Sequence, residues 1–109
     1  MPPISVIFVE PYGSSRTVAA EQDITVMQAA LDNLVEGIVG TCGGACMCAT
    51  CHVYVAAEWL DRLNPMSAME NDMLDSVAAA RKPNSRLGCQ IALTLELHGL
   101  HVSLPETQI

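Results

Sequence analysis

Short apolar runs separated by turn residues dominate both ends of the chain. Residues 4–10 (ISVIFVE) are rich in Ile, Val and Phe, residues 11–15 (PYGSS) supply Pro and Gly, and residues 16–20 (RTVAA) resume an apolar run. This order predicts a β-hairpin, because β-branched residues favour strands while Pro and Gly favour turns. Three further runs of the same kind predict strands at 51–55, 87–93 and 100–104.

A helical pattern follows the hairpin, over residues 25–37. Thr25 and Gln28 have the three-residue spacing of a capping box, and Gly37 supplies a stop. Apolar side chains recur between these ends at helical intervals, at Met27, Ala30, Leu31, Leu34 and Val35. The segment is therefore predicted to be an amphipathic helix with one buried face.

A second helix is predicted over residues 68–80, where Ser67 and Glu70 repeat the capping-box spacing. A helix has about 3.6 residues per turn, so the apolar residues share one face. They are Met73, Leu74 and Val77. Asp72 and Asp75 lie on the opposite side, and we expect them to face solvent.

The order of these elements predicts an α+β domain, in which one mixed sheet packs against a helix. No internal repeat, low-complexity stretch or linker interrupts the chain, so we expect a single domain over residues 1–109. A chain of 109 residues can bury a core without cross-links. Its five cysteines therefore need a chemical explanation.

Composition narrows the classes of partner and compartment. Twelve acidic residues against five basic ones give a net charge of −7, which argues against a nucleic-acid partner and favours a basic protein partner. No apolar run approaches the roughly 20 residues of a membrane span, and the N-terminus carries no targeting pattern. The odd number of cysteines argues against a disulfide framework. We therefore expect a soluble cytoplasmic protein that holds a metal or a cluster.

Four of the five cysteines lie close together. Their spacing is Cys42-x5-Cys48-x2-Cys51, with Cys46 inside the first gap, and Cys89 follows after 37 intervening residues. A four-cysteine zinc site usually pairs two C-x2-C knuckles, and this chain has only one, which disfavours zinc. A thioredoxin-type pair would leave Cys42 and Cys89 unexplained.

A [2Fe–2S] cluster fits this spacing better. It needs four thiolates, two on each tetrahedral iron, and a loop that wraps closely around the sulfurs. Gly43 and Gly44 have no Cβ and let the main chain approach, while Ala45, Ala49 and Thr50 add little bulk. The plant-type C-x4-C-x2-C pattern does not fit, because position 43 is glycine.

Two separate motifs carry a resemblance to a known family. The run Cys42-x5-Cys48-x2-Cys51-His52, together with RLGCQI at 86–91, resembles the adrenodoxin-type, or vertebrate-type, [2Fe–2S] ferredoxins. Within that family, CGGACMCATCHVYV (42–55) and KPNSRLGCQI (82–91) are most similar to the bacterial putidaredoxin branch, which serves cytochrome P450 monooxygenases. The resemblance extends over essentially the whole chain.

The resemblance implies a β-grasp fold and one [2Fe–2S] cluster held by Cys42, Cys48, Cys51 and Cys89. Cys42 and Cys48 would hold the iron nearer the surface, and the other pair the second iron. It further implies a bacterial carrier. We expect this carrier to be cytoplasmic, without membrane or nucleic-acid partners, and monomeric, which is the default for a diffusing carrier. Such a carrier passes single electrons from an NADH-dependent FAD ferredoxin reductase to a cytochrome P450 and is not an enzyme.

Other residues near these motifs receive different interpretations. In the family, the histidine after the third cysteine joins the cluster loop to the domain, which implies a hydrogen-bonding role for His52. Cys46 stands where the family needs no thiol, so it is interpreted as a small loop side chain, and Arg86 is expected to be structural. At Thr41 and Ile109 the best-known redoxin of the branch has an acidic and an aromatic residue. These departures indicate a different P450 or a different docking balance.

Carboxylates are concentrated in residues 58–75, where only Arg62 opposes them. They are Glu58, Asp61, Glu70, Asp72 and Asp75. Charge alone favours an ordinary solvated face. The resemblance implies instead that Asp72, Asp75 and their neighbours dock on basic surfaces of the reductase and the P450, with electrostatic steering of the encounter.

Two other functions remain open at this point. Ferredoxins with the same ligand spacing also donate electrons to iron–sulfur cluster assembly. A β-grasp module with bound zinc and a structural or interaction role is the alternative from another class, and a colourless protein would indicate it.

Overall fold

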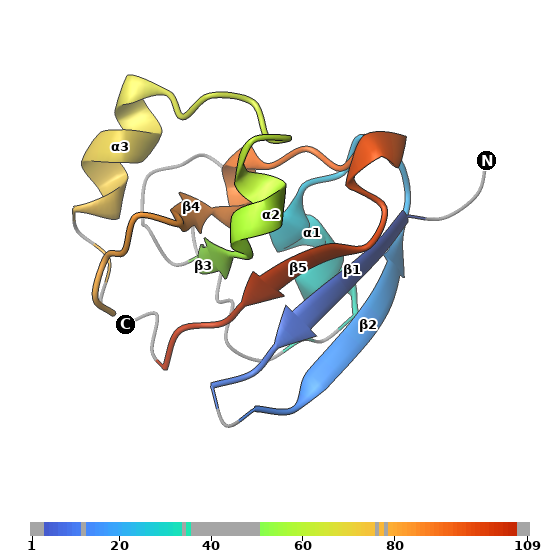
Figure 1. The fold of residues 1–109 in the computed structure, drawn as a ribbon. Helices are drawn as coiled ribbons and strands as arrows, with labels where there is room; N and C mark the ends of the chain where they lie inside the picture. The colour runs from blue at the N-terminus through green and yellow to red at the C-terminus, as the bar shows by residue number, and fades with distance from the viewer. Residues whose placement is uncertain are drawn as a thin grey trace.

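A mixed five-stranded sheet forms the centre of the molecule (Figure 1). The computed structural model describes residues 4–11, 13–33, 35, 51–75, 77 and 79–106. The strands are β1 (Ile4–Val9), β2 (Ser15–Ala20), β3 (His52–Val55), β4 (Ser85–Leu87) and β5 (Leu100–Ser103). Their order across the sheet is β2-β1-β5-β3-β4. β1 and β5 run parallel, and the other neighbours run antiparallel. The predicted α+β class is confirmed.

The predicted N-terminal hairpin is present as β1 and β2, paired from Ile4 opposite Ala20 to Val9 opposite Ser15. Side chains of β1 alternate between buried and half-buried positions, as expected for a strand with one face on the core. The turn needs Gly13, whose φ of +99° is a conformation that residues with a Cβ rarely adopt.

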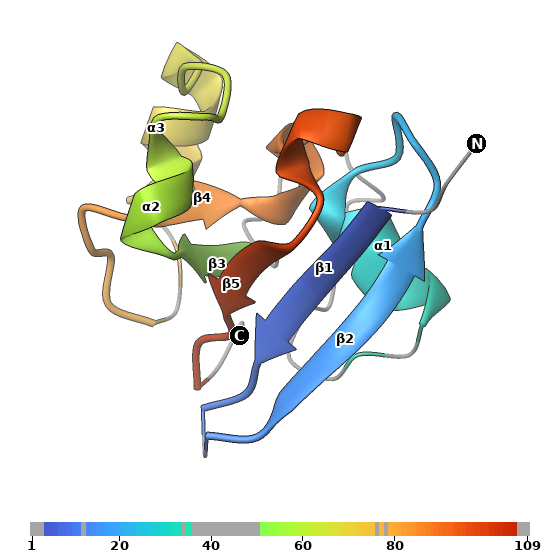
Figure 2. The same ribbon diagram turned by 45° about the vertical axis from the view of Figure 1, so that its right-hand side comes forward.

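The first predicted helix is α1 (Val26–Asp32), which lies behind β1 and β2 (Figures 1 and 2). Its N-cap is Thr25, as predicted, because the Thr25 hydroxyl accepts from the Gln28 amide at 3.1 Å. The Gln28 side chain does not complete a capping box. It donates instead to Asp32 Oδ1, one turn further along the helix, at 2.8 Å.

α1 ends at Asp32 rather than at residue 37. Asn33 caps it, since its side-chain amide donates to the Ala29 carbonyl at 2.8 Å and so competes with continued helix. The Val35 amide then reaches back to the Ala30 carbonyl at 2.9 Å, a bond typical of a helix end. Residues 34, 36 and 37 lie outside the described residues.

The strand predicted at 87–93 is mostly wrong. β4 begins earlier, at Ser85, and ends at Leu87, and a 3₁₀ turn, η1 (Gly88–Gln90), replaces the middle of the predicted strand. Beyond the turn, Ala92 forms only an isolated bridge with Thr25. The chain turns because the Gly88 amide donates to the Cys51 carbonyl at 2.8 Å, after which the backbone leaves the edge of the sheet.

The second predicted helix is α3 (Ala68–Leu74), capped by Ser67 as expected but ending well before residue 80. Residues 76 and 78 lie outside the described part of the chain. Two short elements were not predicted, α2 (Ala57–Leu60) and the 3₁₀ turn η2 (Leu95–Leu97). Each is too short to establish a helical period in the sequence. In both ribbon views α2 and α3 lie on the β3 and β4 side of the sheet (Figures 1 and 2).

The core combines residues from every strand with the buried side of α1. Its largest fully buried apolar side chains include Phe8, Ile4, Met27, Leu74 and Leu87. No described helix is both long and apolar enough to cross a membrane. The single domain over residues 1–109 stays a prediction.

Candidate functional site

Two cysteines that are far apart in sequence meet beside β3. Cys51 immediately precedes β3, and Cys89 is the middle residue of η1. Their side chains are buried, and the Cys89 amide donates to Cys51 Sγ at 3.5 Å. The bond between the Gly88 amide and the Cys51 carbonyl holds the two segments together. The fold therefore brings together two of the four predicted ligands.

Gly88 allows this close approach. A Cβ at this position would lie 3.1 Å from the Met27 backbone nitrogen and 3.2 Å from the Cys51 carbonyl oxygen, both tighter than ordinary contacts. The absence of a side chain thus lets η1 sit directly against α1 and the start of β3. Gly88 is not among the predicted site residues, although it directly precedes Cys89 in the sequence.

Gln90 adds a second donor at the site. Its Nε2 lies 3.4 Å from Cys89 Sγ and 3.4 Å from the Cys89 carbonyl oxygen. The Gln90 side chain is half-buried. Each of the two cysteine sulfurs thus accepts at least one N–H group, and such bonds stabilise negative charge on sulfur.

His52 has the hydrogen-bonding role that the sequence analysis expected. The ring is buried, its Nε2 lies 2.8 Å from Ser85 Oγ, and Ser85 Oγ also accepts from the Lys82 amide at 2.8 Å. Burial, together with the nearby positive charges of Arg81 and Lys82, lowers the pKa of His52 to about 4. His52 is therefore neutral at pH 7, and it joins the start of β3 to β4.

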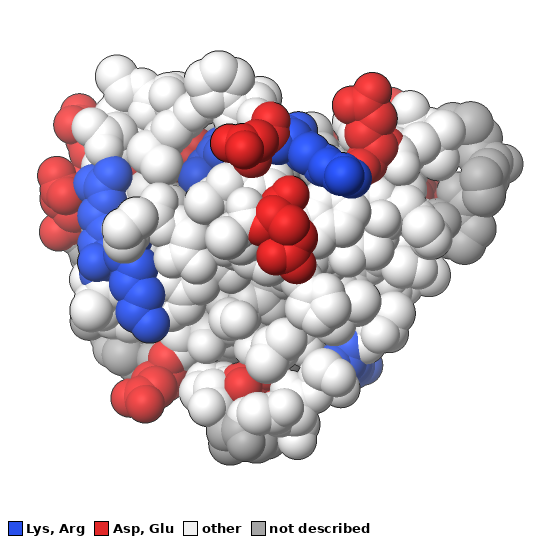
Figure 3. Space-filling view, viewed as in Figure 1, with Lys and Arg blue, Asp and Glu red and all other residues white. Residues whose placement is uncertain are grey.

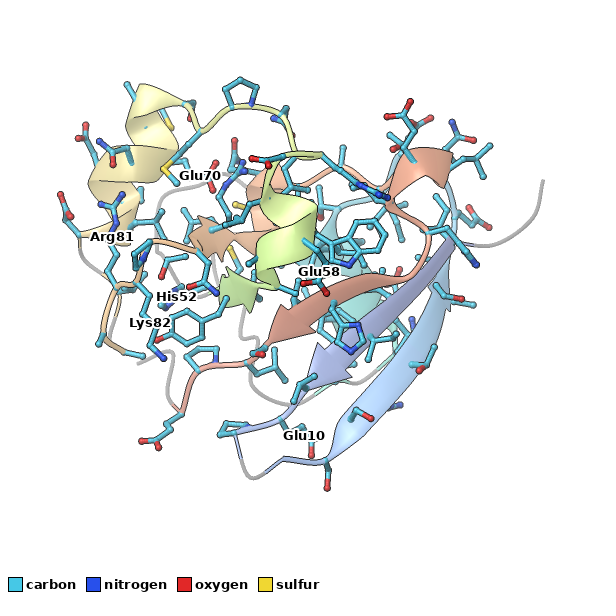
Figure 4. All side chains as sticks on the ribbon, in the orientation of Figure 1. Glu10, His52, Glu58, Glu70, Arg81 and Lys82 are labelled. Atoms are coloured by element: carbon cyan, nitrogen blue, oxygen red, sulfur yellow. The ribbon has the colours of Figure 1, made fainter. Side chains whose placement is uncertain are left out.

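Glu70 does not belong to the acidic surface predicted over residues 58–75. Its side chain is 1% exposed, and it accepts from Arg86 Nε at 2.6 Å and Arg86 Nη2 at 3.0 Å. Glu70 also accepts from the Leu87 amide at 2.9 Å, while Arg86 Nη1 donates to the Asn64 carbonyl at 3.1 Å. Figure 4 shows Glu70 directed from α3 into the molecule. The expectation that Arg86 is structural is confirmed.

The outer side of α3 does carry carboxylates, as predicted. Asp72 and Asp75 are exposed, and Asp75 Oδ1 accepts from Arg81 Nη1 at 2.7 Å. Figure 3 shows acidic side chains at the edge formed by α3 and a basic strip beside them, which contains the Arg81 and Lys82 labelled in Figure 4. The surface is therefore mixed in charge, because Arg81, which lies outside residues 58–75, pairs with Asp75.

Several predicted positions lie outside the described residues. They are Cys42, Cys48, Cys46, Thr41 and Ile109. Among the residues that are described, Cys51 and Cys89 suit an iron–sulfur group, because both cysteines are buried, the Cys89 amide lies against Cys51 Sγ, and each sulfur accepts an N–H donor.

Comparisons with known proteins identify the class that this fold and these thiols define. Residues 9–94 match the model of the 2Fe-2S iron-sulfur cluster binding domain, and the chain belongs to this family. Ferredoxin CarAc from a Sphingomonas species is 52% identical over 105 residues, which cover 96% of this chain and 95% of that protein.

Solved structures agree with this family. The crystal structure of a ferredoxin from Rhodopseudomonas palustris HaA2 has a TM-score of 0.95 at 48% identity and covers 96% of this chain and 99% of that one. A chain of the covalent putidaredoxin reductase–putidaredoxin complex has a TM-score of 0.90 at 44% identity, covering 93% of this chain and 97% of that one. The protein is thus a putidaredoxin-type ferredoxin with a β-grasp fold and one [2Fe–2S] cluster. It is an electron carrier and not an enzyme, and the zinc alternative falls.

Proposed function

We propose that this ferredoxin carries single electrons from an NADH-dependent FAD ferredoxin reductase to a cytochrome P450, with Cys42, Cys48, Cys51 and Cys89 as the cluster ligands. The observation that supports the ligand set most directly is the approach of Cys89 to Cys51 across 37 intervening residues. When bound, the cluster supplies a site that takes up and releases one electron at a time.

The chain's own groups prepare the site for these thiolates. Backbone bonds of Gly88 and Cys89 fix η1 against Cys51, and the His52 contact with Ser85 fixes the strand that follows Cys51. Burial of both sulfurs keeps bulk water away from them. These contacts suit Cys51 and Cys89 as the ligands of the more deeply buried iron.

Serine substitutions test the ligand set. Replacing Cys42, Cys48, Cys51 or Cys89 by Ser should reduce or abolish stable incorporation, measured as iron and acid-labile sulfide per chain and as visible absorption. Cys46→Ser is the matched control, since it removes a thiol from the same segment, and it should keep the full cluster. Loss of the cluster in Cys46→Ser, or its retention in Cys89→Ser with an unchanged spectrum, contradicts the assignment.

Two observations support the reductase and the P450 as the partners. One structural relative is the putidaredoxin chain of a covalent complex with its reductase, and the cysteine motifs resemble those of P450-linked redoxins. The test mixes the holoprotein with NADH, a candidate FAD reductase and a candidate P450, and follows bleaching of the cluster and reduction of the haem. The chain alone should turn over no substrate.

Donation to iron–sulfur cluster assembly is the competing function. The same reduced holoprotein should then transfer electrons faster to assembly proteins than to any P450. That outcome would replace the P450 as terminal partner but leave the carrier role and the ligand set intact. A monomeric, cytoplasmic carrier fits either function, and size-exclusion chromatography with light scattering checks the oligomeric state.

We further propose that Asp72 is the main docking carboxylate of α3. Asp72 is exposed, whereas Glu70 is buried in an ion pair with Arg86 and Asp75 forms an ion pair with Arg81. Asp72→Lys should weaken association with the reductase or the P450 at low ionic strength, and salt should reduce the difference because it screens exposed charges. Glu21→Lys is the matched control, since the exposed Glu21 directly follows β2, one edge strand of the sheet, whereas α3 is bonded to β4, the other edge strand.

A further inference from the structure

Gln90 follows the last predicted ligand and directs its side-chain amide to that ligand's sulfur. Its Nε2 lies 3.4 Å from Cys89 Sγ, within reach of an N–H···S hydrogen bond. The same nitrogen lies 3.4 Å from the Cys89 carbonyl oxygen, so one amide group spans both acceptors of Cys89. Unlike the Cys89 amide that faces Cys51 Sγ, this donor belongs to a side chain and can be removed by substitution.

The backbone around Gln90 is fixed on both sides, which gives the side chain a defined origin. The Ile91 amide closes η1 onto the Gly88 carbonyl at 3.4 Å, and the Ile91 carbonyl accepts from the Val26 amide of α1 at 3.0 Å. Ile91 itself is fully buried in the core. The half-buried Gln90 side chain is therefore presented to the sulfur by a rigid turn.

A donor at this sulfur acts differently on the two redox states. Each electron that arrives from the reductase adds one negative charge to the iron–sulfur site, and part of that charge falls on the thiolate sulfurs. An N–H group aimed at such a sulfur stabilises the more negative state more strongly. Hydrogen bonds to the sulfurs are among the factors that set the potential of iron–sulfur proteins.

We propose that Gln90 is a positioning residue that raises the reduction potential of this ferredoxin by donating from Nε2 to Cys89 Sγ. The proposal rests on the role of Cys89 as a ligand under the proposed function. No bond is made or broken in this step. One electron enters from the reductase and leaves to the acceptor, and the amide proton stays on Gln90 throughout.

The test compares reduction potentials of holoprotein variants by spectroelectrochemical titration. Gln90→Met keeps a similar length without a donor and should lower the potential. We expect the ratio of reduced to oxidised protein at a fixed electrode potential to fall roughly fivefold, the effect of losing one typical hydrogen bond. A fivefold change equals about 40 mV at 59 mV per tenfold for one electron. Gln90→Glu replaces the donor by a negatively charged acceptor and should lower the potential further.

A matched control separates this role from general stability. Gln28→Met loses a glutamine amide that donates to Asp32 Oδ1 on the exposed side of α1, so it removes a comparable bond away from the sulfurs. It should leave the potential unchanged. The Fe–S stretching bands in the resonance Raman spectrum give a second readout, because loss of an N–H···S bond should shift them in Gln90→Met and not in Gln28→Met.

The outcomes also separate this proposal from the ligand assignment. A Gln90→Met protein with full cluster content and the wild-type potential would overturn the role of Gln90 while leaving the four ligands in place. Full cluster with an unchanged spectrum in Cys89→Ser would overturn the ligand set, and the role of Gln90 with it. A lower melting temperature with an unchanged potential would assign Gln90 a purely structural role.

Discussion

Two arginine–carboxylate pairs among the described residues have similar shortest N–O distances, 2.6 and 2.7 Å, and very different surroundings. Arg86 and Glu70 are 6% and 1% exposed and share two hydrogen bonds, whereas Arg81 and Asp75 are 32% and 73% exposed. Water and salt screen the second pair but not the first. The buried pair therefore fixes α3 to β4, and removal of one partner leaves an uncompensated charge in the interior.

This contrast leads to a first prediction. Glu70→Ala should reduce the free energy of unfolding by about 3–5 kcal/mol, the cost typical of breaking a buried ion pair. Asp75→Ala, the matched exposed carboxylate on the same helix, should cost less than about 1 kcal/mol. Urea unfolding followed by circular dichroism measures both. Equal losses in the two variants would mean that the interior position of Glu70 is irrelevant to its contribution.

Ser85 carries a second prediction at the same scale. Its hydroxyl contacts both the buried His52 ring and the Lys82 amide. Ser85→Ala removes this shared partner from two groups and should destabilise the protein by about 1–3 kcal/mol, the cost of a buried polar group that loses its hydrogen bond. The midpoint of thermal unfolding should fall accordingly. Ser103, an exposed serine in β5, provides the comparison, and Ser103→Ala should leave the free energy of unfolding within about 0.5 kcal/mol of the wild-type value.

At the level of elements, both predicted capping boxes form only by half. Thr25 and Ser67 accept from the amides of Gln28 and Glu70, as their spacing requires. The side chains of Gln28 and Glu70 go elsewhere, to Asp32 and to Arg86. In each helix the hydroxyl of the N-cap residue therefore provides the capping. The side chain of the residue three positions later is available for other contacts.

A third prediction follows from this division. Thr25→Ala should cost about 1 kcal/mol of stability, the usual loss for an N-cap. Gln28→Ala should cost less than about 0.5 kcal/mol, because it removes only an exposed contact within one helix. Denaturant midpoints at equal cluster content compare the two variants. A larger loss for Gln28→Ala would indicate that the complete capping box is formed in solution.

The sequence predicted those parts of the fold that depend on local pattern. The hairpin, the starts of α1 and α3 and the strand after Cys51 follow from residues that are neighbours in the chain. The turn at Gly88 did not, because the Cys51 carbonyl and α1 that impose it come from distant segments. The burial of Glu70 was missed for the same reason, since charge counting cannot reveal a partner that folding supplies. The contact between the Gln90 amide and Cys89 could not be predicted, because the sequence RLGCQI does not determine the direction of the Gln90 side chain.

On the scale of the whole molecule, the net charge of −7 overstates how acidic the α3 surface is. Glu70 is buried in an ion pair with Arg86 and adds no charge to the surface, and Arg81 partly neutralises Asp75. A basic strip lies beside these carboxylates (Figure 3). Docking should therefore depend on a few exposed carboxylates rather than on a uniform field. Such an arrangement favours fast encounter with modest affinity, which suits a carrier that must leave again.

A fourth prediction concerns the cluster as a cross-link. Under the proposed ligand set it ties the segment before β3 to η1. Anaerobic removal of iron with a chelator and a reductant should raise amide hydrogen exchange at residues 87–90 by roughly tenfold, because metal binding and local stability are coupled. The β1–β2 hairpin should change little. A uniform rise across the whole chain would mean that the cluster supports global rather than local stability.

The position of β5 in the sheet has a consequence for how this chain folds during its synthesis. The last described strand, β5, pairs with β1 on one side and with β3 on the other. Within the described sheet it is the only strand that joins the β2–β1 pair to the β3–β4 pair. A nascent polypeptide that has emerged from the ribosome only as far as Gly99 can pair β1 with β2 and β3 with β4, but it lacks the strand that joins these two pairs. The described five-stranded sheet can therefore be completed only after residues 100–103 have emerged from the ribosome.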